Sequence, residues 1–155
     1  MQTLALRRTL VHEKSGKVME HFEQIGTRGY YRPVAQVTFE QAVDLVAAAM
    51  LHARSLGLVD LLVNTSGLTG FAPPSVFARY AMSARWAQTA GSSLRVAMVT
   101  RPELIDPQKI GVLMMQNRGG LGDVFVSEAE ALEWLDSGST PGHRPPGPAK
   151  RPPGL

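Results

Sequence analysis

The chain has 155 residues, of which 44% are hydrophobic and 19% charged, and this composition is typical of one globular domain with a sizeable core. It contains no cysteine, which excludes disulfides, thiolate metal sites and a cysteine nucleophile. No apolar run approaches the roughly 18 to 20 residues of a membrane span, and the first residues lack the layout of a signal peptide, so we expect a cytoplasmic protein.

The charge is unevenly distributed along the chain. Residues 1–136 carry 13 Lys or Arg and 13 Asp or Glu, so the net charge of +3 comes entirely from Arg144, Lys150 and Arg151. A nucleic-acid-binding protein needs a basic face on its folded surface, so no nucleic-acid partner is expected. Residues 137–155 are rich in Pro and Gly and have little to bury, which predicts a disordered basic tail after a domain of residues 1–136.

The first third of the chain has the pattern of β structure. β-branched, aromatic and alternating residues occupy segments 4–12, 17–24 and 30–37, with glycine-containing turns between them. Pro33 lies inside the third segment, and proline cannot donate a hydrogen bond to a sheet. We therefore expect an edge strand or a bulge at this position.

From residue 38 onward, amphipathic helices alternate with buried strands. Thr38 and Gln41 fit a capping box that opens a helix, whose apolar face continues to Gly57. The apolar segment 58–63 is then expected to be a buried strand. Ser75 begins the next helix, followed by a second buried strand at residues 94–99. On one side of that helix the pattern places Phe77, Tyr80, Ala81, Ala84 and Gln88.

The last third continues the alternation. Asp106 followed by proline predicts the N-terminus of a helix that carries Ile110, Leu113 and Met114 inward. A short strand at residues 124–126 and a capping box beginning at Ser127 complete the pattern. The sequence thus predicts an α/β fold with a mixed, mostly parallel sheet, antiparallel N-terminal strands and about four helices.

Segment 58–71 marks the expected working end of the molecule. Its apolar run ends abruptly in hydroxyl residues and glycines, and ligands of open α/β sheets collect at the carboxyl ends of strands. The expected ligand or partner crevice consists of five polar residues: Asn64, Thr65, Ser66, Thr69 and Arg79. In the alternative interpretation, the side chains of Asn64 and Ser66 bond the nearby backbone and only shape the turn.

No residues have the spacing of a catalytic or metal site. The four histidines are isolated along the chain: His12, His21, His52 and His143. Ser66 lacks the G-x-S-x-G pattern of a hydrolase nucleophile. The glycine-rich residues 118–122 follow a helix and precede a strand, whereas a phosphate-binding loop precedes its helix, so a helix end and turn are expected. We therefore expect no catalytic residues, no cofactor and no metal.

Two further interpretations concern Ser75 and the methionines. Phosphate on Ser75 would be favoured by the helix dipole and by Arg79, while plain helix capping is the alternative. Methionines and aromatic residues could form a pliable apolar pocket, although the same pattern is typical of core packing. These residues are Met50, Met82, Met98, Met114, Met115, Phe71, Phe77, Tyr80 and Trp86.

Three segments carry a family resemblance. They read LLVNTSGLT at residues 61–69, LRVAMV at 94–99 and VFVSEAEALEWL at 124–135. Over residues 30–135 the chain is similar to STAS domains, a group named after sulphate transporters and anti-sigma-factor antagonists. Within this group it most resembles the bacterial single-domain branch, which is often grouped with the CRAL-TRIO lipid-transfer fold. The resemblance implies a sheet with helices packed largely on one side, and no catalysis.

The same resemblance points to a phosphorylation switch. In anti-sigma-factor antagonists, an Asp-Ser-Ser-Gly motif holds the phosphorylated serine. The matching residues 72–75 read Ala-Pro-Pro-Ser, so Ser75 alone could take that role. Asn64 replaces the acid that is common at the end of the preceding strand.

The sequence as a whole predicts a non-enzymatic regulatory or binding module. We expect it to recognise a protein partner or a small apolar or anionic, lipid-like ligand at the crevice within residues 64–79. The alternatives are a phospho-regulated anti-sigma-factor antagonist acting through Ser75, and a small hydrolase or transferase. Residues 1–136 carry no net charge and Pro33 is expected near an edge strand, so these features do not decide whether the protein forms a homodimer.

Overall fold

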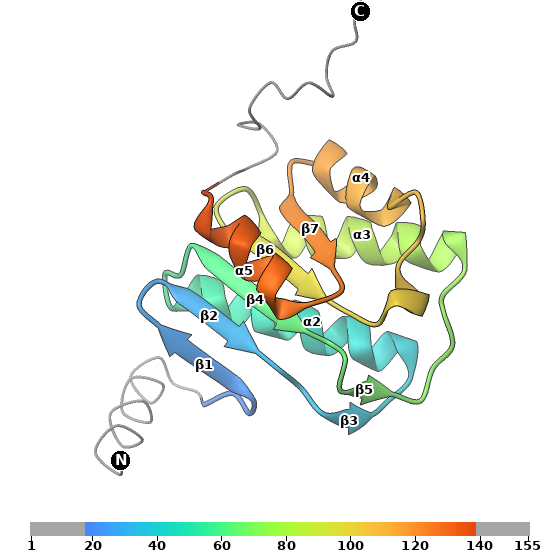
Figure 1. Ribbon diagram of the computed structural model, residues 1–155, viewed down its shortest axis with the longest axis horizontal. Helices are drawn as coiled ribbons and strands as arrows, with labels where there is room; N and C mark the ends of the chain where they lie inside the picture. Colours follow the sequence, from blue (N-terminus) through green and yellow to red (C-terminus); the bar gives the residue numbers. More distant parts are fainter. Residues whose placement is uncertain (1–17, 139–155) are drawn as a thin grey trace, which may run out of the picture.

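A five-stranded sheet forms the centre of the computed structural model, which describes residues 18–138 (Figure 1). Its strands, in spatial order, are β1 (Phe22–Ile25), β2 (Arg28–Tyr31), β4 (Asp60–Asn64), β6 (Arg95–Val99) and β7 (Leu121–Phe125). β1 and β2 are antiparallel, and every later neighbouring pair is parallel. Two short strands, β3 (Ala35–Gln36) and β5 (Leu68–Thr69), pair separately in parallel. The α/β class and the mixed, mostly parallel sheet are confirmed.

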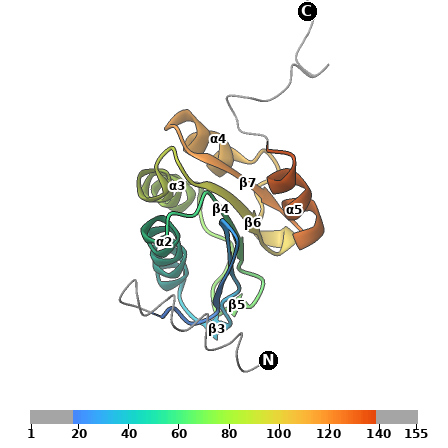
Figure 2. The same ribbon diagram turned by 90° about the vertical axis from the view of Figure 1, so that its left-hand side faces the viewer.

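The described residues contain four α-helices, which cover both faces of the sheet. They are α2 (Phe39–Ser55), α3 (Val76–Ala90), α4 (Ile110–Asn117) and α5 (Glu128–Asp136), with a short 3-10 turn at Pro102–Leu104. α2 and α3 cover one face, α4 packs against α3 and β7 on that same side, and α5 lies on the other face (Figure 2). Three helices therefore lie on one side of the sheet and one on the other.

The alternating direction of side chains along the central strands explains why the sheet has a separate core on each face. Leu61 and Val63 of β4 face α2 and α3, together with Val96 of β6. Leu62 points to the opposite face, where it packs with Leu135 of α5 in a smaller core cluster. Because successive side chains of a strand point to opposite faces, β4 separates two cores that share no side chains.

The predicted helix starts at Thr38, Ser75 and Ser127 are confirmed. Thr38 and Gln41 form both bonds of the capping box, at 3.1 and 3.0 Å. The hydroxyl of Ser75 accepts a hydrogen bond from the amide of Ala78 at 3.1 Å, and that of Ser127 accepts one from Glu130 at 3.2 Å. Each side chain satisfies an amide that the first turn of its helix leaves without a backbone partner.

The predicted helix start at Asp106 is wrong. The Asp106 carboxylate accepts a hydrogen bond from the amide of Gln108 at 3.0 Å, so it stabilises a turn, and α4 begins only at Ile110. Lys109 stands before the helix with a positive φ of 51°. Its ammonium bonds Asp123 and the carbonyl of Val124, at 3.1 and 3.2 Å, and these tertiary contacts set the point at which the helix begins.

The residues that the pattern groups on one side of α3 lie on its largely exposed side, and the predicted inward position of Leu113 on α4 is wrong. Phe77 is 83% exposed and Tyr80 47% exposed, and the buried side of α3 consists of Ser83, Trp86, Ala87 and Ala90. On α4, Leu113 is 53% exposed, whereas Met115 is buried. α3 packs against both α2 and α4, and the side toward these neighbours carries a serine and small alanines, which a search for large apolar residues overlooks.

Several strands begin or end at residues other than those the sequence predicts. Segment 30–37 divides into the end of β2 and β3, because Pro33 lies between them and takes part in neither ladder. Segment 17–24 contributes only the beginning of β1. β7 begins at Leu121, since Leu121 pairs with Arg95 of β6, and it ends before Val126. Gly119, with a φ of 86°, makes the expected turn before it.

Other predictions fall at the ends of the chain. The expected strand at residues 4–12 and nearly all of the expected tail, from residue 139, lie outside the described residues. α5 ends at Asp136, the predicted end of the folded domain. Within residues 18–138, no helix is long and apolar enough to cross a membrane.

Candidate functional site

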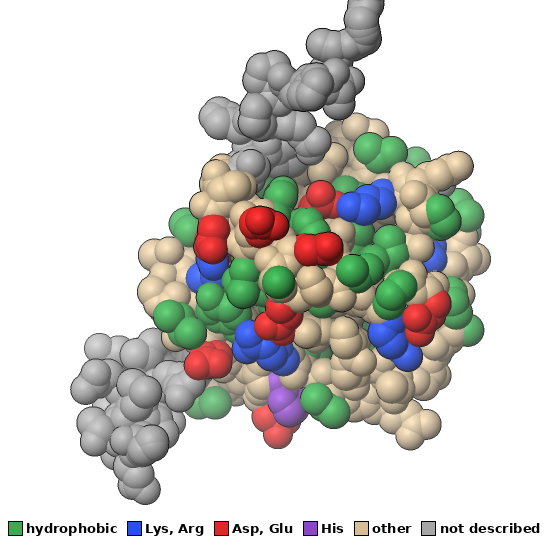
Figure 3. All heavy atoms as spheres, viewed as in Figure 1, with side chains coloured by type: hydrophobic (Ala, Val, Ile, Leu, Met, Phe, Trp, Pro, Cys, Tyr) green, Lys and Arg blue, Asp and Glu red, His purple; other side chains and the backbone are tan. Residues whose placement is uncertain are grey.

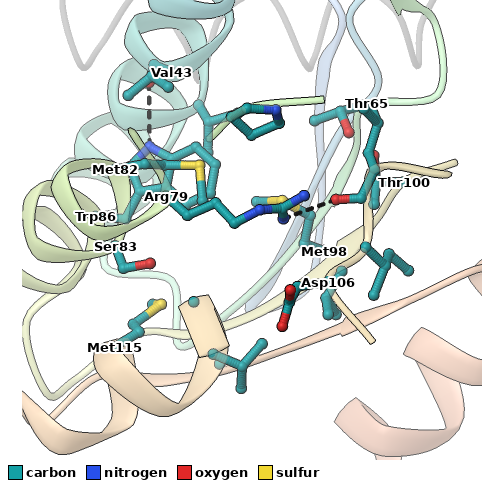
Figure 4. Close-up of a pocket in the computed structure, with 18 of the residues that line it drawn as sticks. Val43, Thr65, Arg79, Met82, Ser83, Trp86, Met98, Thr100, Asp106 and Met115 are labelled. Atoms are coloured by element: carbon teal, nitrogen blue, oxygen red, sulfur yellow. Dashed lines mark hydrogen bonds between the residues drawn. The ribbon is translucent and has the colours of Figure 1, made fainter. Parts of the chain in front are cut away.

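A cavity of about 130 Å³ lies between the sheet and helices α2, α3 and α4 (Figure 4). Most of its wall is apolar. On one side the wall consists of Val43, Val46 and Met50 of α2 with Met82 and Trp86 of α3. Met98 of β6 lies at the sheet, and further apolar lining includes Phe71, Leu104, Ile105, Val112 and Met115.

The indole of Trp86 has a fixed position in this wall. Its Nε1 donates a hydrogen bond to the carbonyl of Val43 at 3.2 Å, which ties α3 to α2 (Figure 4). Unlike the indole, the flexible thioether side chains of Met82, Met98 and Met115 can adapt to ligands of different shape. The cavity thus has one rigid aromatic wall and several adaptable ones.

Polar and charged groups also line the cavity. They are Thr65, Arg79, Ser83, Thr100, Asp106, Lys109 and Asp123. Lys109 pairs with Asp123 at 3.1 Å, and Thr65 donates to the carbonyl of Val99 at 3.2 Å. Nη1 of Arg79 donates to the carbonyl of Leu104 at 3.0 Å. With two cations and two anions, the lining has no net formal charge.

Only two of the five predicted crevice residues line this cavity. Thr65 and Arg79 do so, while Asn64, Ser66 and Thr69 do not. Alternation explains the difference, because Asn64 points to the α5 face and Thr65 to the α2 face. The Asn64 side chain accepts a hydrogen bond from the amide of Ser66 at 2.9 Å, which is the turn-shaping contact of the alternative interpretation. Thr69 is exposed on β5.

Asn64 also belongs to a polar network that holds α5 against the strand ends. Its Nδ2 donates to Glu128, the first residue of α5, at 2.8 Å. Arg32 donates two hydrogen bonds to the same carboxylate, at 2.8 and 3.0 Å. The bonds from Arg32, followed by the bond from Asn64, lower the pKa of Glu128 below its ordinary value despite partial desolvation.

This network predicts a pH-dependent contribution to stability. A carboxyl whose folded-state pKa is lowered stabilises the fold above its unfolded pKa of about 4.3, and this contribution is lost as the pH falls through the folded-state pKa. We therefore expect Glu128→Gln to be less stable than the wild type at pH 7, with the difference closing at acid pH. Urea unfolding of both proteins at several pH values measures it. A difference that stays constant with pH would contradict the prediction.

Ser75 serves as the N-cap of α3 in the described structure. Its hydroxyl bonds the amide of Ala78, and the Arg79 guanidinium reaches the carbonyl of Leu104 inside the cavity. The capping interpretation of Ser75 therefore accounts for its contacts. The amide of Arg79 donates to the carbonyl of Ser75 at 3.0 Å, but among residues 18–138 no hydrogen bond or ion pair joins the Arg79 guanidinium to Ser75.

The apolar pocket expected from methionine and aromatic residues contains some of those side chains and not others. Six of those nine side chains line the cavity, namely Met50, Met82, Met98, Met115, Phe71 and Trp86. Met114, Phe77 and Tyr80 do not, and the Tyr80 ring lies under the guanidinium of Arg118 at 5.3 Å. The two interpretations, core packing and pocket formation, therefore both apply, because the side chains that pack against the sheet also leave space between the helices.

Sequence reasoning missed the contribution of residues 100–112. Thr100, Leu104, Asp106 and Val112 follow the carboxyl end of β6 and form one side of the cavity. The rule that ligands collect at strand ends applies to β6 as well as to β4, so this signal was present in the sequence.

Comparison of the chain with protein-family models, curated proteins and solved structures gives no match. The resemblance to STAS domains therefore stays a prediction, and the geometry of the cavity carries the argument for function. Within the described part of the chain, no three His, Asp or Glu residues are grouped so that they could hold a metal ion. On the face seen in Figure 3, basic and acidic side chains are interspersed and form no continuous basic surface.

Proposed function

We propose that the protein is a non-enzymatic binding module whose ligand is a small apolar molecule held between α2, α3 and α4. The observation that carries this proposal is the cavity of about 130 Å³ with methionine and aromatic walls. An apolar cavity of about 150 Å³ is large enough to bind benzene. Binding sites for small molecules are typically apolar hollows with a few placed polar groups, and this cavity has that character.

The lining supports binding over catalysis. A general base or a nucleophile with its base would have to face the bound molecule, and neither His21 nor His52 lines the cavity. Of the carboxylates that do, Asp123 is paired with Lys109 and Asp106 accepts a hydrogen bond from the amide of Gln108. His52 lies instead edge-on against the ring of Phe22, with 4.7 Å between the ring centroids. Ser66, the residue considered for hydrolase chemistry, lies outside the cavity.

The proposal predicts that filling the cavity abolishes binding. Val112 is half-buried and lines the cavity, so Val112→Phe places a ring in the space that the ligand would occupy. We expect toluene or benzyl alcohol to shift the methyl signals of Met82, Met98 and Met115 in methyl-labelled wild-type protein. Val112→Phe should weaken this binding by about tenfold or more, a loss of at least about 1.4 kcal/mol.

A neighbouring residue provides the matched control. Leu113 follows Val112 on α4 but is exposed and lies outside the cavity, so Leu113→Phe should bind the probes as the wild type does. Met19 and Met114, which do not line the cavity, report that each variant is folded. The proposal fails if neither probe shifts the cavity methionines, or if both variants bind equally well.

A further inference from the structure

The two cations of the cavity differ in how many of their donors are occupied. Lys109 bonds both Asp123 and the carbonyl of Val124. The guanidinium of Arg79 makes one hydrogen bond, from Nη1 to the carbonyl of Leu104, and among the described residues no carboxylate lies within ion-pair distance of it. Arg79 is therefore a charged group of the cavity with most of its bonding capacity unused.

The arginine side chain is directed into the cavity. Figure 4 shows it extending from α3 toward Met98, with its guanidinium between Thr100 and Asp106. A guanidinium has five N–H donors, so one bond leaves four for a ligand. The apolar walls lower the local dielectric around this half-buried cation, which strengthens its attraction to an anion.

The charges around the cavity favour a carboxylate over a phosphate. A guanidinium matches the two oxygens of a carboxylate with two parallel hydrogen bonds. A phosphate monoester carries nearly two negative charges, and Lys109 is already paired with Asp123. The carboxylate of Asp106 also lines the cavity and repels an anionic ligand, and this repulsion is about twice as large for a dianion as for a monoanion. One cation without an ion pair thus fits one negative charge.

We propose that the ligand is a small monocarboxylate whose carboxyl group bonds Arg79. Its apolar body, about as large as a benzene ring, packs between Trp86 and the cavity methionines. This inference rests on the proposed function and adds the chemical class of the ligand. It also gives Arg79 a role that neither packing nor helix capping explains.

The test compares an acid with its neutral isostere. Phenylacetate and phenylacetamide have the same apolar body, and only the first carries the charge. We expect phenylacetate to bind the wild type about 10- to 100-fold more tightly, which is the range expected for hydrogen bonds to a charged group. Titration followed through the methyl signals of Met82 and Met98 gives both dissociation constants.

Substitutions on α3 assign the effect to one residue. Arg79→Met should weaken phenylacetate binding by the same 10- to 100-fold and leave phenylacetamide binding unchanged, which also shows that the variant is folded. Arg79→Lys keeps the charge but loses the planar pair of donors, so it should fall between the two. Arg85→Met is the control, because Arg85 pairs with Asp44 on the surface and does not line the cavity.

The outcomes separate the two proposals. Equal binding of the acid and the amide, or an equal loss of both in Arg79→Met, would overturn the carboxylate inference while the binding module stands. If toluene, benzyl alcohol, phenylacetamide and phenylacetate all fail to bind, the proposed function itself is wrong. Preferential loss of phenylacetate binding in Arg79→Met, with Arg85→Met unaffected, supports the inference.

Discussion

Asp60→Asn should destabilise the fold by about 3 kcal/mol, because it removes the anion from a cross-strand ion-pair network. Asp60 lies opposite Arg28 of β2 and opposite Arg95 of β6 in the sheet register. Its carboxylate is 3.2 Å from Nη2 of Arg28 and 2.9 Å from Nη2 of Arg95, and its side chain is only 9% exposed. The asparagine keeps the shape but leaves two partly buried cations facing a neutral group.

Urea unfolding followed by tryptophan fluorescence measures this loss. Asp44→Asn is the matched control, since Asp44 pairs with Arg85 while both side chains are about half exposed or more. Exposed pairs contribute roughly 0 to 1 kcal/mol, so the control should stay close to the wild type. Equal stability of Asp60→Asn and the wild type would show that the other partners of the arginines, Asp136 and the carbonyl of Leu135, are sufficient.

Leu135→Ala should cost about 3 to 4 kcal/mol, because it opens a cavity in the smaller of the two cores. Leu135 is 1% exposed and packs with Leu62, Ala97 and Val99 beneath α5. α5 is the one described helix on this face of the sheet, so no other helix can close over the space. The loss should appear as a lower urea midpoint with an unchanged slope.

Leu132→Ala on the same helix provides the comparison. Leu132 is only partly buried against this core, so its truncation removes less apolar surface from contact and should cost about 1 kcal/mol. Binding of neutral probes should survive both substitutions, since the ligand cavity lies on the opposite face of the sheet. Equal losses from the two leucines would contradict burial as the reason for the larger effect at Leu135.

The separation of the two faces gives the candidate site its character. Asn64 and Thr65 are neighbours in sequence, but Asn64 bonds Glu128 at the start of α5 and Thr65 lines the cavity beside α2. Residues at one strand end thus serve two purposes. Some hold α5 in place, and others contribute to the ligand cavity.

Local patterns were sufficient for part of the fold. The caps Thr38, Ser75 and Ser127 act on amides three residues away, so their effect depends on little beyond the local sequence. The apolar runs of β4 and β6 are likewise read from composition, because strands buried on both faces need apolar side chains throughout. For these reasons the helix–strand alternation and the sheet type were predictable.

The site depended on contacts between distant residues. The inward side of α3 is decided by α2 and α4, which approach it from two directions, so Phe77 is exposed and Ser83 is buried. The start of α4 is decided by the bonds of Lys109 to β7 and not by Asp106. Neither contact leaves a periodic signal in the local sequence.

The sequence by itself determined the alternation of helices and central strands from residue 38 onward and the strand ends at which polar residues gather. The tertiary structure alone decided which of these residues share a cavity, since this depends on the face to which each strand residue points and on how closely three helices approach the sheet. Thr65 and Arg79 meet in that space while Asn64, Ser66 and Thr69 stay outside it. The physical reason is that hydrogen-bonded caps and apolar runs act over a few residues, whereas a cavity is the volume left when whole elements pack.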